Sequence, residues 1–164
     1  MLKYATIAIS SFGLFNAATV PKTSGVSCAA PDNTNVDWVG CAVDNAWYGV
    51  SKAATYDHFS AEFRLCAELG GHVAWMNDED EDSCAAQALI QTNTVDQYVV
   101  LSGDYHEDLG EWMWPHLHAF TYDDWFAGST QVGNCMGSYY DGENYGWLQA
   151  DCLEKSKAMC RVDC

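Results

Sequence analysis

The pattern of hydrophobic and polar positions predicts short strands along most of the chain and two helices near its middle. In the first helical stretch, from Thr55 to Leu69, the side chains of Phe59, Phe63 and Cys66 recur at the spacing of one helical face. Thr55 is a residue type that favours the N-terminal cap of a helix. We therefore expect a helix that begins after Thr55 and directs Phe59, Phe63 and Cys66 into the core.

A run of acidic residues after Asn77 predicts the start of a second helix, which extends to about Gln91. Carboxylates at a helix N-terminus are stabilised by the macrodipole and by capping. A calcium-binding loop is the alternative interpretation of the run from Asp78 to Asp82. The spacing lacks the glycine turn of an EF-hand, which favours the helix.

The remaining hydrophobic segments are typical of short strands. Apolar and β-branched residues predict buried strands over 42–50, 72–76, 97–101, 111–114 and 158–162. Cys135 and Cys152 flank a segment with the turn sequence Asp141-Gly142-Glu143-Asn144, which predicts a hairpin with Trp147 packed inside it.

The first residues have the layout of a secretory signal peptide. A lysine at position 3 precedes an apolar run to Phe15, and the small residues Ala17 and Ala18 follow. We expect a signal peptide over 1–18 and one domain over 19–164. No later segment approaches the roughly 18 apolar residues of a membrane helix, so we expect a secreted, extracellular protein.

Cysteine content and charge narrow the expected environment and partners. Eight cysteines in a secreted chain imply a full set of disulfides, for which about 105 pairings exist. Twenty-three acidic residues against seven lysines and arginines give a formal net charge of −16. Such a field disfavours nucleic acid and favours cations, mineral surfaces or basic proteins as partners.

Taken in order, these features resemble the C-type lectin-like domain over nearly all of 28–162. The matching positions are Cys28, Trp38, Cys41, Ala61, Cys66, the segment Gly70-Gly71-His72-Val73-Ala74, Glu81, the segment Tyr98-Val99-Val100-Leu101, the segment Trp112-Met113-Trp114, Tyr122, Trp125, Cys135, Trp147, Cys152 and Cys160.

The resemblance implies an α+β fold in which two helices flank small antiparallel sheets and a long loop leaves the core between Leu101 and Cys135. It also implies disulfides that staple the domain. The pairings implied are Cys66 with Cys160, Cys135 with Cys152 and Cys28 with Cys41, and the leftover Cys84 and Cys164 suggest a fourth bridge.

The calcium-bridged sugar site of this family does not carry over to this chain. The family's ligand triplet in the long loop falls on Ser129-Thr130-Gln131, which has no proline and no carboxylate. Gly133 stands where an acidic residue is expected, and Leu148-Gln149 follow Trp147 in place of Asn-Asp. Calcium requires about 6–8 oxygen ligands, several of them carboxylates, so the resemblance implies binding without the usual calcium bridge.

A second calcium position of the family draws on the start of the long loop. Here the chain has Asp104, Glu107, Asp108 and Glu111, whose carboxylates suit a hard cation. A solvated acidic loop explains the same residues without a metal. No cofactor is required, and calcium at this auxiliary position stays open.

The remaining chemistry points to a binding surface. His116 and His118 form the closest histidine pair, but a zinc site would need further ligands, and no nucleophile with a positioned base is recognisable. We therefore do not expect an enzyme. Aromatic and amide side chains near the turn of the predicted hairpin suit a glycan or a protein partner. The candidate ligand-binding residues are Gln131, Asn144, Tyr145 and Gln149, together with Tyr139 and Tyr140.

The leading hypothesis is a secreted C-type lectin-like recognition module, with a role in innate immunity, that binds carbohydrate or an extracellular protein without the usual calcium. One alternative is an acidic structural protein that adsorbs to biomineral or ice. The other alternative is a calcium-dependent lectin that uses the acidic loop from Asp104 to Glu111.

Overall fold

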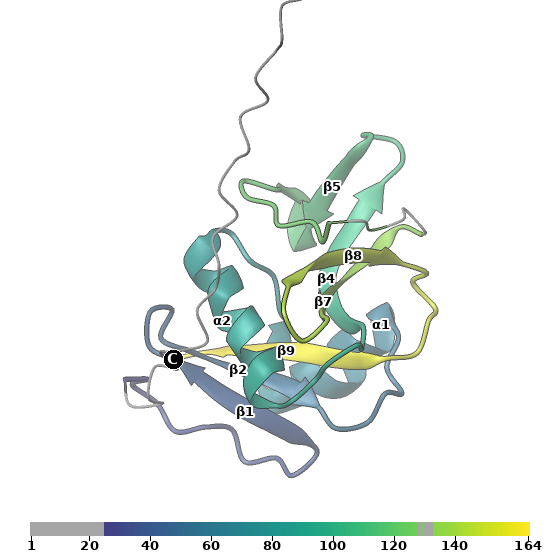
Figure 1. Cartoon of the computed structure of the whole chain (residues 1–164). Helices are drawn as coiled ribbons and strands as arrows, with labels where there is room; N and C mark the ends of the chain where they lie inside the picture. The colour runs from purple at the N-terminus through teal and green to yellow at the C-terminus, as the bar shows by residue number, and fades with distance from the viewer. Residues whose placement is uncertain (1–24, 128, 130–132) are drawn as a thin grey trace, which may run out of the picture.

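The long strand β9 (Lys157–Asp163) lies at the centre of the molecule and joins its two halves (Figure 1). The computed structural model describes residues 25–127, 129 and 133–164. Strand β9 pairs antiparallel with β2 (Ala46–Ser51) and with the short β3 (His72–Val73). Its first residues pair in parallel with β4 (Val99–His106). The two halves therefore share one mixed sheet, in which most pairings are antiparallel, as expected.

The lower half in Figure 1 is a hairpin placed against β9. Strand β1 (Val36–Cys41) pairs antiparallel with β2 in the register Val36↔Ser51 to Cys41↔Ala46. Inward side chains such as Tyr48 and Val50 are almost fully buried. This alternation places one face of the hairpin in the core.

The upper half carries the strands that position the functional site. Strand β4 pairs with β5 (Glu111–Trp114) on one side and with β7 (Cys135–Tyr140) on the other. Strand β7 forms a hairpin with β8 (Tyr145–Ala150), and a 3₁₀ turn (Pro115–Leu117) leads into the short β6 (His118–Ala119). The hairpin predicted between Cys135 and Cys152 is confirmed. Strand β4 continues to His106, into the stretch expected to be loop.

The first helical segment differs from the prediction in its cap and in its buried face. It consists of α1 (His58–Ala61), a π-helical turn (Glu62–Cys66) and a 3₁₀ turn (Ala67–Leu69), and its N-cap is Asp57. Phe59 and Phe63 are 57% and 73% exposed. A π-helical turn is wider than an α-helical turn, so it changes the angle between Phe59, which precedes it, and Cys66, which ends it. The prediction that these two phenylalanines enter the core is therefore wrong, whereas Cys66 is buried as expected.

The second helix, α2 (Glu79–Gln91), agrees with the prediction. Asp78 is its N-cap, and the Asp78 carboxylate accepts a 3.0 Å hydrogen bond from the Glu81 amide. The helix buries one apolar face, made by Cys84, Ala85, Ala88 and Leu89. Asp82, although acidic, lies on the inner side and is only 3% exposed.

All eight cysteines are paired, and two of the expected pairings are wrong. Cys66–Cys160 and Cys135–Cys152 form as the resemblance implied. The other four cysteines pair as Cys28–Cys164 and Cys41–Cys84, not as Cys28–Cys41 and Cys84–Cys164.

The positions of the strands explain these pairings. Cys41 ends β1 in the core cluster beside α2, so its sulfur meets Cys84 across a Cα–Cα distance of 5.8 Å. Asn45 brings the two ends of the domain together, because its side chain accepts from the Ser27 amide and its carbonyl from the Cys164 amide.

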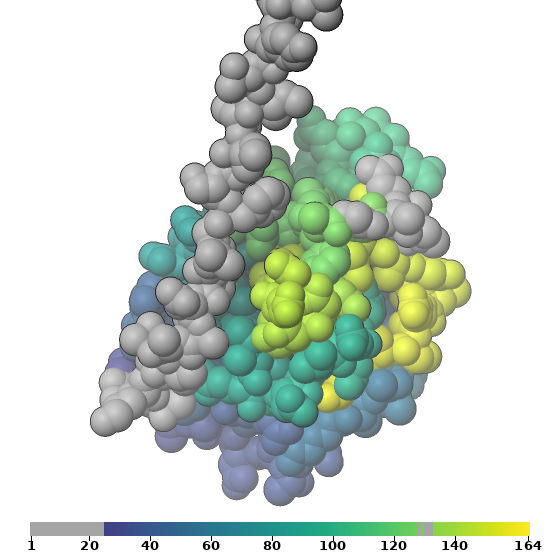
Figure 2. Space-filling model, in the orientation of Figure 1, coloured from purple at the N-terminus to yellow at the C-terminus, as the bar shows by residue number. Residues whose placement is uncertain are grey.

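The core of the upper half is rich in aromatic residues. Trp147 is fully buried and makes edge-to-face contacts with Trp114, Phe120 and Tyr122 at centroid distances of 5.4–5.8 Å. Figure 2 shows the lime-green residues around position 140 packed over the teal residues that include α2. The amide of Asp96, just after this helix, donates to the Tyr140 carbonyl. Within the residues described, no helix is long and apolar enough to cross a membrane.

Candidate ligand-binding cleft

A cleft of about 480 Å³ opens where the β4–β5 hairpin meets the β7–β8 hairpin. Its lining residues are Tyr105, Trp112, Gly133, Asn134 and Gln149. Two of these side chains are aromatic and two are amides. The volume of this cleft is within the range of sites for small ligands.

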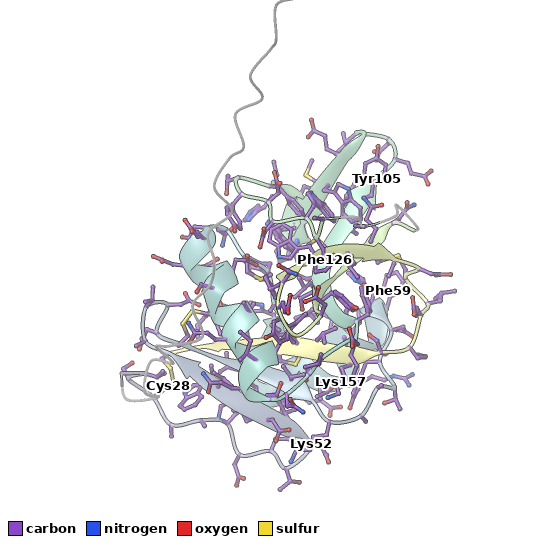
Figure 3. All side chains as sticks on the ribbon, viewed as in Figure 1. Cys28, Lys52, Phe59, Tyr105, Phe126 and Lys157 are labelled. Carbon is purple, nitrogen blue, oxygen red and sulfur yellow. A yellow bond between two sulfur atoms is a disulfide. The ribbon has the colours of Figure 1, made fainter. Side chains whose placement is uncertain are left out.

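The aromatic wall follows from the register of the β4–β5 hairpin. Tyr105 pairs directly with Trp112, so both side chains lie on one face of the ribbon. Their ring centroids are 5.6 Å apart at an interplanar angle of 55°. Trp112 also contacts Trp125, with centroids 5.1 Å apart, which supports the wall from behind. Figure 3 shows Tyr105 at the upper end of the molecule.

The amide wall is held by the start of β7 and the end of β8. The Tyr105 amide donates a 2.7 Å hydrogen bond to the Asn134 carbonyl. The Asn134 side-chain amide donates to Glu107 Oε1 at 2.9 Å. Gly133 has a φ of +95°, and a Cβ at this position would lie 2.2 Å from the Ala150 carbonyl oxygen. Only glycine therefore permits this close approach beside Gln149.

A buried carboxylate, Asp82, anchors residues 122–126, the segment that supports the aromatic wall through Trp125. Its Oδ1 accepts from Trp147 Nε1 at 2.8 Å and from the Tyr145 hydroxyl at 2.9 Å, and its Oδ2 accepts from the Tyr122 hydroxyl at 3.2 Å. Burial raises the pKa of Asp82 to about 7, despite these donors and with a contribution from the neighbouring Asp124. Burial likewise raises the pKa of Asp124.

Backbone hydrogen bonds complete this anchorage. The Trp147 amide donates to the Asp124 carbonyl at 2.8 Å, and the Phe126 amide donates to the Trp147 carbonyl at 3.0 Å. Trp125 is thereby held against Trp112. The position of the cleft wall thus depends on how residues 124–126 dock on β8.

Comparisons with known proteins identify the fold. No protein-family model matches the chain, and no curated protein sequence matches it. Human lithostathine superposes with a TM-score of 0.64 over 81% of this chain and 100% of its own, at 14% identity. The chain has the C-type lectin-like fold.

Two further structures with this fold are similar over comparable lengths. SPL-2 from Saxidomus purpuratus, a Ca²⁺-independent C-type lectin, superposes with a TM-score of 0.59 and 16% identity, over 84% of this chain and 99% of its own. The carbohydrate-recognition domain of the mouse scavenger receptor C-type lectin has a TM-score of 0.57 and 19% identity, over 79% of this chain and 94% of its own. In this C-type lectin-like domain, Tyr105, Trp112 and Asn134 all come from the long-loop region between Leu101 and Cys135.

The structure places one of the predicted ligand-binding residues in the cleft. Gln149 lines it, whereas Asn144 and Tyr145 lie at the other end of β8, about 13–17 Å away at the rise of a strand. Asn144 stabilises the hairpin turn through hydrogen bonds to Asp141, and the Tyr145 hydroxyl donates a hydrogen bond to Asp82. Gln131 lies outside the described residues.

The other two predicted tyrosines also use their hydroxyls within the domain. Tyr139 donates to Asp96 Oδ1 at 2.9 Å, and Tyr140 donates to the Gly142 carbonyl at 2.7 Å. These contacts stabilise the β7–β8 turn and the loop after α2. The turn region is therefore held by internal hydrogen bonds, and it lies apart from the cleft that Gln149 lines.

The acidic residues proposed for an auxiliary calcium site do not converge. In the described parts of the chain, no three histidine, cysteine, aspartate or glutamate side chains are grouped so as to hold a metal. Asp104 contacts His106 at 3.1 Å, and Glu107 accepts from Asn134. Asp108 and Glu111 are exposed at the turn and at the start of β5. His116 and His118 have ring centroids 6.5 Å apart, and no third ligand joins them among the residues that the structure describes.

Three cleft residues, Tyr105, Trp112 and Asn134, were not predicted as functional from the sequence. A usable signal was present, because Glu107-Asp108-Leu109-Gly110 is a turn sequence, and Gly110 adopts a φ of +71°. A hairpin about this turn pairs Tyr105 with Trp112 and places two aromatic rings on one face. Asn134 precedes Cys135 and carries no such signal.

Proposed function

We propose that this chain is a lectin-like recognition module that binds a saccharide in the cleft between Tyr105, Trp112, Asn134 and Gln149. The observation that carries the proposal is the combination of two aromatic rings and two amides around one cleft. Aromatic faces cover the apolar C–H face of a sugar ring, and amides bond to its hydroxyls. The carbohydrate-recognition domain of the mouse scavenger receptor, which has the same fold, supports this proposal.

We further propose that binding does not depend on a bridging calcium. Gly133 and Gln149, which occupy two of the family's ligand positions, carry no carboxylate. The four carboxylates from Asp104 to Glu111 do not converge. The Ca²⁺-independent lectin SPL-2 provides a precedent for this fold.

Export from the cell is part of the same proposal. Four disulfides involve all eight cysteines, which suits an oxidising compartment. The segment proposed as a signal peptide, 1–18, lies outside the described residues. The ligand would then be an extracellular glycan.

The direct test is binding to a glycan array with calcium and with EDTA. We expect the same glycans to bind in both buffers, with coincident thermal unfolding midpoints, because no bound ion stabilises the native state. Gln149→Ala should weaken binding about tenfold, since it removes a half-buried polar partner of the ligand. Gln97→Ala, which removes an exposed glutamine before β4, is the matched control and should bind normally. Loss of binding in EDTA, or no bound glycan in either buffer, would overturn the proposal.

The acidic composition favours a second candidate, adsorption to a mineral surface. A net charge of −16 attracts calcium-rich crystal faces. Adsorption to calcium carbonate that persists in Gln149→Ala, with no binding to the array, would support this candidate over the first.

A further inference from the structure

The distribution of basic residues around the cleft is strongly one-sided. From Leu65 to Glu154 the chain contains no lysine or arginine, and this stretch supplies all the described residues that line the cleft. The basic residues of the described chain are Lys52, Arg64, Lys155, Lys157 and Arg161. An anionic ligand in the cleft would therefore find no lysine or arginine on the elements that surround it, and His106, on β4, lies against the Asp104 carboxylate at 3.1 Å.

Most of these basic side chains are engaged elsewhere. Arg161 bridges Asp44, Glu81 and Asp163 at 2.8–2.9 Å. Lys155 pairs with Asp57, Lys52 pairs with Asp37 at 3.2 Å, and Lys157 donates to Thr94. Figure 3 shows Lys52 and Lys157 in the lower half of the molecule, whereas Tyr105 lies at its upper end.

The polar groups of the cleft favour a ligand that donates hydrogen bonds. The Asn134 side chain uses one N–H of its amide to bond Glu107, which leaves its carbonyl oxygen and a single N–H for a ligand. The same hydrogen bond holds the Glu107 carboxylate against Asn134, next to the residues that line the cleft. Asn134 and Glu107 therefore present acceptors and a negative charge at this wall.

The opposite wall also attracts positive charge. The faces of tryptophan and tyrosine rings carry negative electrostatic potential and bind ammonium groups. Tyr105 and Trp112 stand side by side, with ring centroids 5.6 Å apart. A cationic group on a sugar would be attracted from both sides of the cleft, and a carboxylate or sulfate would be repelled.

We propose that the cleft selects saccharides that carry a free, protonated amine, such as glucosamine oligomers, over N-acetylated and anionic saccharides. This inference rests on the proposed function, because it names the class of saccharide that the same cleft takes. The Glu107 carboxylate and the Tyr105 and Trp112 rings recognise the ammonium group, and Gln149 bonds to the hydroxyls.

The test compares three ligands on the full oxidised chain in mildly acidic buffer, with binding followed by calorimetry. The probes are a glucosamine oligomer, its N-acetylated counterpart of equal length and a sulfated counterpart. We expect the amine form to bind most tightly, the sulfated form not to bind, and the preference for the amine to fall as salt is added.

A substitution at Glu107 tests whether this carboxylate selects the ammonium group. Glu107→Gln should weaken binding of the amine form roughly two- to fivefold, in the range of exposed ion pairs, and leave the N-acetylated form unaffected. The amide oxygen introduced can still accept from Asn134, so the wall should keep its shape. Glu68→Gln removes the same charge from an exposed helical turn and serves as the control.

The outcomes separate the inference from the function on which it rests. If the N-acetylated oligomer bound equally or more tightly, and if Gln149→Ala weakened that binding, the amine preference would be overturned. The proposal that the cleft binds a saccharide would stand. Absence of binding to all three oligomers would overturn both. Binding of oligolysine as tightly as the glucosamine oligomer would show recognition of ammonium groups alone, and would overturn the saccharide class.

Discussion

Asp82 is a carboxylate in surroundings that suit a protonated acid. It is 3% exposed and lies among Trp147, Tyr122, Tyr145 and Asp124, with no basic residue among its hydrogen-bond partners. Three donors stabilise the ionised form, but burial and the adjacent Asp124 outweigh them, so the pKa rises to about 7. The acidic first turn of α2 thus contains one residue, Asp82, whose charge depends on whether the chain is folded.

This raised pKa predicts that the domain becomes less stable as the pH increases. The unfolded value is 3.8, so between about pH 4 and pH 7 the folded state holds a proton at Asp82 that the unfolded state has lost. The contribution of Asp82 to the free energy of unfolding is full below pH 4 and is lost by about pH 7. Its size is on the order of 4 kcal/mol, because each tenfold difference in proton affinity between the folded and unfolded states corresponds to about 1.4 kcal/mol.

Urea unfolding of Asp82→Asn over this pH range measures the effect. The variant cannot lose the proton, so its stability should change less with pH than that of the wild type. Asp80→Asn, an exposed carboxylate in the same helical turn, is the control and should keep the wild-type slope. Parallel pH profiles for wild type and Asp82→Asn would show that Asp82 does not titrate in this range.

At the scale of elements, the cleft depends on the contact between residues 124–126 and strand β8. Gly146 makes this contact close, since a Cβ there would lie 2.8 Å from both the backbone nitrogen and the Cα of Phe126. The backbone hydrogen bonds of Trp147 to Asp124 and Phe126 follow directly. The docked segment holds Trp125 behind Trp112, and so couples β8 to the β4–β5 hairpin.

Gly146→Ala should therefore undock this segment without unfolding the β7–β8 hairpin. Overpacking of this kind destabilises by about 1–3 kcal/mol. We expect hydrogen exchange to accelerate at the Phe126 and Trp147 amides, while the Met136 amide, within β7, stays protected. Saccharide binding should weaken in the same variant. Unchanged exchange at Phe126 and Trp147 would mean that the segment is held by other contacts.

Elements defined by local signals were predictable from the sequence. The β7–β8 hairpin follows from its turn sequence, and α2 follows from its acidic cap and apolar face. The buried face of α1 was not predictable, because the π-helical turn at 62–66 changes the spacing on which the prediction relied. That turn is stabilised by long-range contacts, such as the hydrogen bond from the Val73 amide to Glu62.

The cleft was only partly predictable for the same reason. Gln149 could be found because a resemblance to known lectins marks the residues after Trp147. Tyr105, in β4, and Asn134, directly before β7, meet through the β4–β7 pairing, which no local pattern reports. Asn144 and Tyr145 are near Gln149 in sequence, but an extended strand rises about 3.3 Å per residue, so they lie too far from Gln149 to share its cleft.

At the scale of the whole molecule, two of the disulfides join segments that are not paired as neighbouring strands. Cys28–Cys164 ties the start of the described chain to its end, across 136 residues. Cys41–Cys84 fastens the lower hairpin to α2. The resemblance implied a local Cys28–Cys41 staple, but in the structure β1 runs beside β2, so Cys41 lies against the helix and Cys28 lies near the C-terminus.

A tryptic digest without reduction distinguishes the two sets of pairings. Cleavage after the basic residues gives a fragment over 23–52 that contains both Cys28 and Cys41. With the pairing seen in the structure, this fragment stays attached to 162–164 through Cys164 and to 65–155 through Cys84. A Cys28–Cys41 bridge would instead release 23–52 as a separate peptide with an internal disulfide. We expect mass spectrometry of the unreduced digest to show no free 23–52 peptide, and reduction to release it. Its release before reduction would mean that the lower hairpin is stapled to itself, and Cys84 of α2 would then be left to pair with Cys164, directly after β9.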